Sequence, residues 1–277
     1  MIDLHTHSTA SDGRLSPTAL VERAAARGVV RLALTDHDTV AGVEEARGAA
    51  AACGLDLVAG SEISATWERR TLHVVGLGLD IECQRLADGL RRQQQERATR
   101  AREIANRLAR IGLRDGLTRA REAAGEGEIG RAHFAGLLVD DGLARNRQDA
   151  FKRYLRPGRP GYRRTVWAGL EDVIGWIHAA GGRAVLAHPF GYGFSGAWRQ
   201  RAVAAFAAAG GDGLEICTGV STVTQESQSA RDARRHGLAG SIGSDFHAPE
   251  QFWLDIGRTR RLPDTVPALA FAAAPPA

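Results

Sequence analysis

Three observations predict an α/β fold in which a parallel sheet or barrel carries a small helical insertion. Strand-like and helix-like segments alternate over residues 1–81 and again over 166–277, and between them lies a stretch with helical periodicity alone. The length of 277 residues suits one α/β barrel with an insertion and is short for two ordinary domains. Hydrophobic residues make up 44% and charged residues 25%, a composition that excludes a largely disordered chain.

The first part of the chain opens with a short strand, IDLHTHS, which is followed by a helix. Ser16 is the expected N-cap of this helix, Pro17 lies in its first turn and Gly28 ends it. The next predicted elements are a strand at 29–38, a helix at 40–54 and strands at 55–65 and 71–80. This β-α-β-α-β order favours parallel strands.

The periodicity changes near residue 82, where strand signals stop. A long helical run at 86–112 and shorter helical pieces precede the turn residues PGRPGYRR. We therefore predict a helical insertion at 82–165, which would cap the substrate, between barrel segments 1–81 and 166–277. Strands are then expected at 183–189, 212–219 and 239–247, helices at 170–182, 198–211 and 226–237, and an irregular tail from about Pro263.

The net charge of +4 conceals an uneven distribution. Residues 85–165 contain 20 basic and 10 acidic residues, whereas the remainder contains 16 basic and 22 acidic residues. The insertion is therefore predicted to attract polyanions. All but one of the cations are arginines, either because the planar guanidinium suits phosphate or because GC-rich coding favours arginine over lysine; the sequence favours neither explanation.

Composition also bears on the compartment. The chain has no run of 18 apolar residues, and its start, MIDLHTHSTASDG, lacks the basic and apolar regions of a signal peptide. Three widely spaced cysteines form no CxxC pair, which favours reduced thiols. We expect a cytoplasmic protein with no membrane association, and no sequence feature indicates an obligate protein partner.

Histidines and carboxylates gather at or near the carboxyl ends of the predicted strands, which is the active edge of α/β barrels. His5 and His7 form an HxH pair whose side chains share one face of a strand. The candidate metal ligands are His5, His7, Asp12, His37, Glu62, His73, His188, Asp245 and His247. Asp36 and Asp38 are expected to orient a neighbouring histidine instead.

Nine nitrogen and oxygen donors without a thiolate exceed the needs of one ion. Two or three divalent ions sharing a bridging carboxylate such as Glu62 would use them, and the donor types favour manganese, with zinc or iron as alternatives, over calcium. A single histidine at a strand end is usually only solvated. Here, however, six of the nine histidines lie at predicted strand tips, which favours metal ligation for these six. Of the other three, His178 and His236 lie within predicted helices and His133 lies in the insertion.

Five motifs in order carry a resemblance: HTHSTASDG, TDHDT, GSEIS, AHP and GSDFH. Together they resemble the PHP (polymerase and histidinol phosphatase) family of metal-dependent phosphoesterases. The resemblance implies a distorted (β/α)7 barrel with a trinuclear metal centre. It further implies three ligand groups: His5, His7, Glu62 and Asp245; Glu62, His73 and His188; and Asp12, His37 and His247. The third group would hold a third ion or, if that ion is absent, contact the substrate phosphate.

Segments such as WERRTLHVVGLGLD and GRAHFAGLLV are similar to one branch, which contains nucleoside 3′,5′-bisphosphate phosphatases and 5′-to-3′ exoribonucleases of the RNase AM type. Many relatives carry Pro at Ala132, Lys at Arg159 and YVP at residues 162–164. The implied substrates are 3′,5′-bisphosphonucleotides such as pAp and 5′-phosphorylated single-stranded oligonucleotides. The expected substrate contacts are Asp12, His37, Arg97, Thr99, Arg100, Arg131, His133 and His247.

Arg97 and Arg100 lie on one helical face, where they would hold a 5′-phosphate above the metals with Arg131 and His133. The alternative is a solvated basic face. No RNA-binding motif is present, so a nucleic acid would be held at its end, with Phe134 or Tyr162 as stacking platforms.

The predicted reaction is metal-dependent phosphoester hydrolysis without a Ser or Cys nucleophile. Asp245 is the candidate for handling the proton of the attacking water, and His188 or His247 for assisting the leaving group. Two alternatives stay open: a small-molecule phosphomonoesterase of the histidinol-phosphatase type, and a non-catalytic metal-binding module.

Overall fold

The computed structural model describes residues 1–125, 127, 129–251 and 253–271, and its centre is a seven-stranded sheet in sequential order. The sheet curls into a nearly closed barrel, because Leu4 N–H donates to Ile242 O at 3.1 Å and Thr6 pairs with Phe246. The strands are β1 (Ile2–Asp3), β2 (Arg31–Leu34), β3 (Asp56–Trp67), β4 (Arg70–Leu77), β5 (Arg183–Leu186), β6 (Gly213–Thr218) and β7 (Ala239–Gly243). The predicted α/β class and barrel are confirmed.

The expectation of parallel strands throughout is wrong for β4. This strand is antiparallel to both β3 and β5, whereas the other neighbouring strands are parallel. Strands β3 and β4 form a hairpin whose two turn residues, Glu68 and Arg69, both have positive φ angles, of 42° and 65°. Such turns normally carry Asn or Gly, so Glu-Arg gave no hairpin signal in the sequence.

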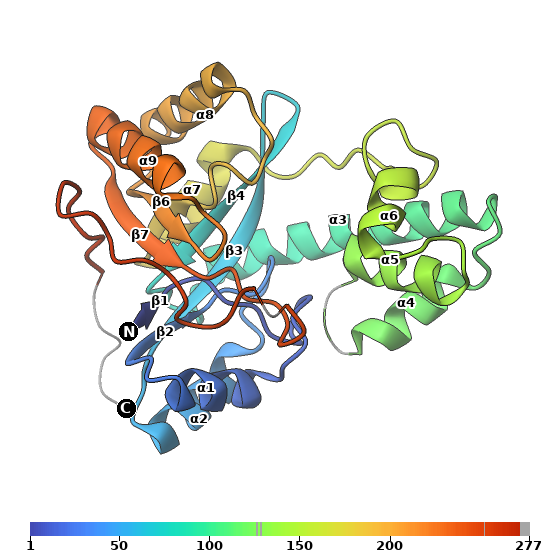
Figure 1. Ribbon diagram of the computed structural model, residues 1–277, viewed down its shortest axis with the longest axis horizontal. Coiled ribbons are helices and arrows are strands. Elements are labelled where there is room, and N and C mark those ends of the chain that lie inside the picture. Colours follow the sequence, from blue (N-terminus) through green and yellow to red (C-terminus); the bar gives the residue numbers. More distant parts are fainter. Residues whose placement is uncertain (126, 128, 252, 272–277) are drawn as a thin grey trace.

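Helices surround the barrel, as Figure 1 shows. Leu20 of α1 and Val43 of α2 pack with Leu32 and Leu57 of the neighbouring strands. Helices α7, α8 and α9 cover the other side, where Ile177 and Phe206 lie in the largest apolar cluster. The bounds of these helices are α1 (Pro17–Ala26), α2 (Val43–Cys53), α7 (Leu170–Ala179), α8 (Gly196–Ala208) and α9 (Val223–His236).

One long helix connects the barrel to the insertion. Its first half packs on the barrel through Leu86 and Leu90, and its second half packs in the insertion core through Ile104 and Leu108. Figure 1 shows this helix leading outward to the remaining helices of the insertion. The elements are α3 (Gln84–Ala109), α4 (Gly116–Ala124), α5 (Arg131–Asp140), α6 (Arg147–Ala150) and a π-helix, η1 (Phe151–Leu155). The boundaries at 82 and 165 stay a prediction.

The chain after Pro263 is more ordered than its composition indicated. Val266 is buried, and Leu269 N–H donates to Gly240 O at 2.9 Å beside β7. Residues 272–277 of the predicted tail lie outside the described residues. Within the described ranges, no helix combines the length and apolarity needed to cross a membrane, and the three cysteines are free thiols.

Gly89 provides a test of how tightly α3 is anchored to the barrel. A Cβ at this position would lie 2.4 Å from the Trp176 ring on α7, whereas a Cβ at Gly48 on α2 meets nothing within 4 Å. We expect Gly89→Ala to destabilise the protein by about 1–3 kcal/mol through overpacking, although alanine is the better helix former. Gly48→Ala should stabilise it by up to ~1 kcal/mol.

Denaturant unfolding at equal metal content measures both changes. Equal stability of the two variants would show that α3 adjusts without cost.

Candidate metal centre and substrate cavity

Six strands bring the predicted ligands to one edge of the barrel. His5 and His7 follow β1, His37 follows β2, and His188 follows β5. The remaining ligands at strand ends or within strands are Asp245 and His247 after β7, Glu62 in β3 and His73 in β4. Asp12 comes from the loop between β1 and α1, so the set depends on the closure of the whole barrel.

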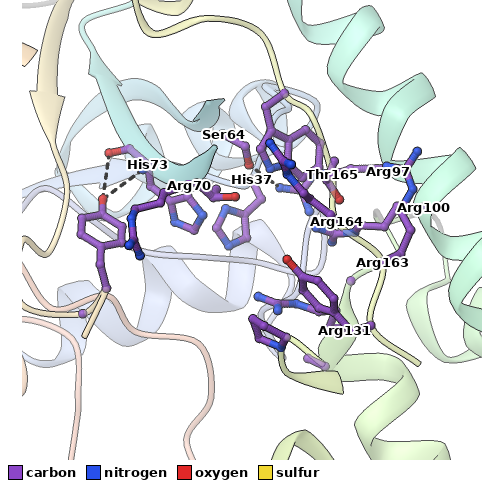
Figure 2. A pocket seen from close by; sticks show the side chains of 18 of the residues that line it. His37, Ser64, Arg70, His73, Arg97, Arg100, Arg131, Arg163, Arg164 and Thr165 are labelled. Atoms are coloured by element: carbon purple, nitrogen blue, oxygen red, sulfur yellow. Dashed lines mark hydrogen bonds between the residues drawn. The ribbon is translucent and has the colours of Figure 1, made fainter. Parts of the chain in front are cut away.

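His73 reaches this edge because β4 runs antiparallel. It lies near the start of β4, opposite Ser64 of β3, and not at the carboxyl end expected from the sequence. The His73 backbone N–H donates to the Tyr192 hydroxyl oxygen at 3.0 Å (Figure 2). The Tyr192 hydroxyl in turn donates to Ala187 O at 2.9 Å. Tyr192 thereby ties β4 to the loop after β5, a role that gave no signal in the sequence.

Glu62 is the central carboxylate of the cluster. Its Oε2 lies 3.4 Å from His5 Nε2, 3.3 Å from His7 Nε2 and 3.0 Å from His37 Nδ1. Its Oε1 lies 2.8 Å from His73 Nδ1 and 2.9 Å from His188 Nε2. Burial raises the pKa of Glu62, but the surrounding imidazoles, His37 foremost, hold that pKa well below its usual range.

Three overlapping groups of donor atoms are compact enough to hold a cation each. In each group every donor atom lies within 4.8 Å of the others. The groups are His5, His7, Glu62 and Asp245; His37, Glu62 and His73; and His7, Asp12, His37 and His247. Among the groups found in the described residues, the second contains His37 where the resemblance implied His188, although His188 Nε2 lies 2.9 Å from Glu62 Oε1.

The third group pairs Asp12 with His247. Asp12 Oδ1 lies 3.4 Å from His247 Nε2, and His247 Nδ1 bonds to Asp245 O at 2.9 Å. Burial favours the neutral imidazole, but Asp12 outweighs it and raises the pKa of His247 to about 10. The same interaction holds the pKa of Asp12 well below its usual range against the effect of burial. The field of the buried carboxylates therefore favours positive charge at this edge.

The residues fit divalent cations. Among the described residues, the buried atoms Asp12 Oδ1 and His37 Nδ1 have no hydrogen-bond partner, although each lies near other donors of the cluster. His5 Nε2 lies only 3.1 Å from His7 Nε2, so two imidazole nitrogens converge on one point. Nitrogen and carboxylate donors in this arrangement suit a transition metal ion.

Glu215 in β6 is a functional residue that the sequence reasoning missed. Its side chain is buried, accepts a hydrogen bond from His188 N at 2.6 Å and lies 3.0 Å from His5 Nδ1. Because Glu215 contacts Nδ1, the Nε2 atom of His5 is directed at the cluster. Carboxylates outside the ligand set orient ligating histidines in this way in metal sites. The available signal was a single carboxylate inside an otherwise apolar strand.

Backbone strain is concentrated at the same edge. Asp38, His188 and Asp245 have positive φ angles, of 53°, 28° and 58°. Non-glycine residues in this region cost of the order of 1–3 kcal/mol each and mark functional sites. Asp245 N–H donates to His5 O at 2.9 Å and Asp38 N–H to Glu62 O at 3.0 Å, so the strained positions are held by the ligand-bearing strands.

Asp36 and Asp38 have different partners from those predicted. Asp36 accepts hydrogen bonds from Ser8 N at 2.7 Å and from the hydroxyls of Ser8 and Ser11, both at 2.6 Å. Asp38 forms a buried ion pair with Arg97 and accepts from Ser64 N at 2.7 Å. Both carboxylates therefore brace loops of the site, and neither forms a hydrogen bond to a histidine.

A cavity of about 530 Å³ opens beside the cluster, between the barrel and the insertion. Asp12, His37, His73 and His188 form its floor. Its walls carry seven arginines: Arg69, Arg70, Arg97, Arg100, Arg131, Arg163 and Arg164. Figure 2 shows Arg100, Arg131, Arg163 and Arg164 on one side of His37 and Arg70 on the other. The cavity combines a metal-ligand floor with strongly cationic walls.

The arginines of the cavity differ in how they are paired. Arg97 is committed to Asp38, and Arg163 to Glu96 and Glu103. Arg100 stacks on Trp167 at 5.1 Å from the ring centroid. Burial, together with Arg97 and Arg131 nearby, lowers the pKa of Arg100 well below its usual value. Mutual repulsion of this kind is relieved by an anion.

The other predicted substrate contacts are spread around the cavity. Arg131 and Tyr162 line it, whereas His133 lies in a smaller neighbouring cavity with Asp12 and accepts a hydrogen bond from Gly130 N at 3.0 Å. The Thr99 hydroxyl accepts a hydrogen bond from Arg102. Phe134 is fully buried in the insertion core, so its predicted role as a stacking platform is wrong.

Comparisons with known proteins agree with this geometry. The model of the PHP domain matches residues 3–178. A 3′,5′-nucleoside bisphosphate phosphatase of Chromobacterium violaceum is 44% identical over 95% of this chain and 92% of its own length. A 5′-3′ exoribonuclease of Haemophilus influenzae is 45% identical over 95% of this chain and 96% of its own length.

A solved structure from Chromobacterium violaceum, described as an amidohydrolase with bound sulfate and no metal, superposes with a TM-score of 0.91. It is 43% identical and covers 96% of this chain and 93% of its own. The family expected from the motifs is thereby confirmed: this chain belongs to the PHP family of metal-dependent phosphoesterases.

Proposed function

We propose that this protein hydrolyses the 3′-phosphoester of nucleotides that carry a 5′-phosphate. The observation that carries the proposal is the cavity in which guanidinium groups face a floor of metal ligands. The phosphatase and exoribonuclease names of the two relatives support it. The substrates would be 3′,5′-bisphosphonucleotides such as pAp and 5′-phosphorylated single-stranded RNA or DNA, shortened stepwise from the 5′ end.

The cationic wall would select the 5′-phosphate. Arg100 and Arg131 both face the cavity, and Arg100 lies among like charges, so an added phosphate would gain from both. A phosphate held there would lie at a fixed distance from the metal-ligand floor. That distance would place the next phosphate along the nucleotide, whether terminal or within a chain, over the ligands.

We propose two to three divalent ions, manganese first, held by the three donor groups around Glu62. Bound ions would lower the pKa of a water molecule and neutralise charge on the phosphoryl group. Glu62 would be shared between ions, and Glu215 would orient His5.

The chain's own residues would handle the protons. The Asp245 side chain is about one-third exposed (34%) and lies 3.3 Å from His7 Nε2, so it can accept a proton from water beside the cluster. His247 Nδ1 lies 3.6 Å from Asp245 Oδ1 and His188 Nε2 lies 2.9 Å from Glu62 Oε1, and either histidine would donate to the leaving oxygen. We place this reaction in the cytoplasm, which the three free thiols support.

Metal content gives the first test of the proposal. The purified protein should bind two to three divalent ions per chain, as measured by elemental analysis. Glu62→Gln should release at least one ion and lower kcat by roughly 100-fold or more, because it removes the carboxylate shared by the groups. Glu44→Gln, at an exposed carboxylate on α2, is the control. Full activity of Glu62→Gln at unchanged ion content would contradict the assigned role.

The arginine wall gives the second test. Arg100→Ala and Arg131→Ala should each lower kcat/KM for pAp about tenfold to a hundredfold, because a charged hydrogen bond contributes roughly 1.5–3 kcal/mol. The loss on p-nitrophenyl phosphate, which lacks a second phosphate, should be small. Arg110→Ala, exposed at the end of α3, should behave as wild type.

Equal losses on both substrates would mean that these arginines serve the fold. Arg97→Ala should lower activity on both, because it leaves Asp38 buried without its partner.

The 5′ end of the substrate gives the third test. One short single-stranded RNA is prepared with a 5′-monophosphate, with a 5′-hydroxyl, or with a 5′-monophosphate and a blocked 3′ end. We expect the first and third to be degraded at similar rates and the second at least about tenfold more slowly, because it lacks the charged contact. Rapid degradation of the 5′-hydroxyl RNA, or protection of the RNA by the 3′ block, would refute both the 5′-to-3′ direction of degradation and the selection of the 5′-phosphate by the arginines.

A further inference from the structure

The metal ligands border a second cavity, of about 290 Å³, whose described lining includes no residue of the insertion. His188 and Gly191 line both this cavity and the arginine-lined one. Asp245 lines the second cavity and is absent from the described lining of the first. The ligand cluster therefore has two openings, and the proposed proton acceptor faces the second.

The lining of this second cavity differs from the cationic walls of the first. It is built from the loops after β5 and β6 and from α9, with Phe190, Ile216 and Val220 beside Thr218 and Gln225. No arginine or lysine is among its described lining residues. Apolar and neutral polar groups of this kind suit a sugar and base better than they suit a phosphate.

A third cavity continues from the second. Both are lined by Thr218 and Ser221, and the third has a volume of about 540 Å³. Its lining carries Trp253, which is 53% exposed, and three arginines: Arg27, Arg258 and Arg260. Glu226 and Asp255 pair with Arg260 and Arg27 from outside the cavity and hold them in place. None of its described lining residues is a carboxylate.

We propose that these two cavities form a track for the part of a single-stranded oligonucleotide that lies 3′ of the cleaved bond. The inference rests on the proposed function, because the 5′ nucleotide would occupy the arginine-lined cavity. The first nucleotide after the scissile phosphate would then lie against Phe190 and Val220. Arg258 and Trp253 would take a later phosphate and base.

The physical reason is continuity. A chain whose 5′ nucleotide fills the cavity under the insertion would leave the ligand cluster by its other opening. Single strands are typically held by a cationic groove with an aromatic platform, and the third cavity offers both. A bisphosphonucleotide has nothing beyond its 3′-phosphate, so it would not use the track.

Two variants test the track while sparing the ligands. Val220→Glu adds a negative charge at the second cavity, and Trp253→Ala removes the platform. Each should lower kcat/KM for a 5′-phosphorylated single-stranded RNA of 12 nucleotides by about tenfold, because loss of one stacked base or repulsion of one phosphate is of that order. Hydrolysis of pAp should change by less than about twofold.

Val30→Glu is the matched control. Val30 is 63% exposed against 67% for Val220, and it lines neither cavity. It should leave both substrates unaffected. Equal losses on RNA and pAp, or no loss on RNA, would overturn the track. So would a Trp253→Ala variant that changed only the oligomeric state, because Trp253 would then belong to an interface between copies.

Crosslinking separates failure of the track from failure of the proposed function. A 5′-phosphorylated RNA with 4-thiouridine at its third nucleotide is irradiated with the Glu62→Gln variant, and the adducts are mapped by mass spectrometry. Adducts within 218–225 or 253–260 support the track, and adducts confined to the insertion overturn it. Wild-type protein that hydrolyses neither pAp nor RNA would overturn the proposed function, whereas hydrolysis of pAp alone would overturn only the track.

Discussion

Glu62 is a buried carboxylate in the middle of β3, and its two oxygens lie within 3.4 Å of five imidazoles. A buried anion is costly unless cations or hydrogen bonds surround it. The barrel supplies these partners from four other strands or their ends, so β1, β2, β4 and β5 all have to deliver a histidine to one point. The long β3–β4 hairpin follows from the same need, because it brings His73 back alongside the strand that carries Glu62.

The same constraint ties the insertion to the barrel. Asp38 follows β2 next to His37, and its carboxylate is buried against Arg97 of α3. Gln94 on the same helix donates to Asp38 O at 3.2 Å. Breaking a buried ion pair of this kind costs about 3–5 kcal/mol, so the position of α3 relative to the ligands is held firmly. Arg100, one turn further along α3, is thereby placed over the floor of the cavity.

Local patterns in the sequence predicted much of the barrel and its ligands. HxH, TDHDT and GSDFH are short motifs at strand ends, where the carboxyl edge of an α/β barrel gathers them, and the structure brings all nine predicted ligands together. The antiparallel β4 could not be predicted, because Glu68 and Arg69 occupy a turn that normally selects Asn or Gly. Contacts between residues remote in sequence could not be predicted either. The residues around Arg97 do not indicate its pairing with Asp38, and those around Glu215 do not indicate its contact with His5. Phe134 failed as a platform because an aromatic residue on a short, largely apolar helix is as readily a core residue as a surface one.

The two openings of the ligand cluster give one chemical account of two substrate classes. Hydrolysis of a terminal 3′-phosphate and of an internal phosphodiester would share the nucleotide cavity, the ligands and the proton acceptor, and would differ only in what departs. For pAp the departing group is inorganic phosphate, which needs little space. For an oligonucleotide it is the rest of the chain, which needs an unobstructed path. Asp245 faces that path with a partly exposed carboxylate, whereas Glu62 is sealed beneath the cluster. Under the proposed reaction, Asp245 would exchange protons with water at the open side of the cluster, whereas Glu62 would hold cations from its enclosed side.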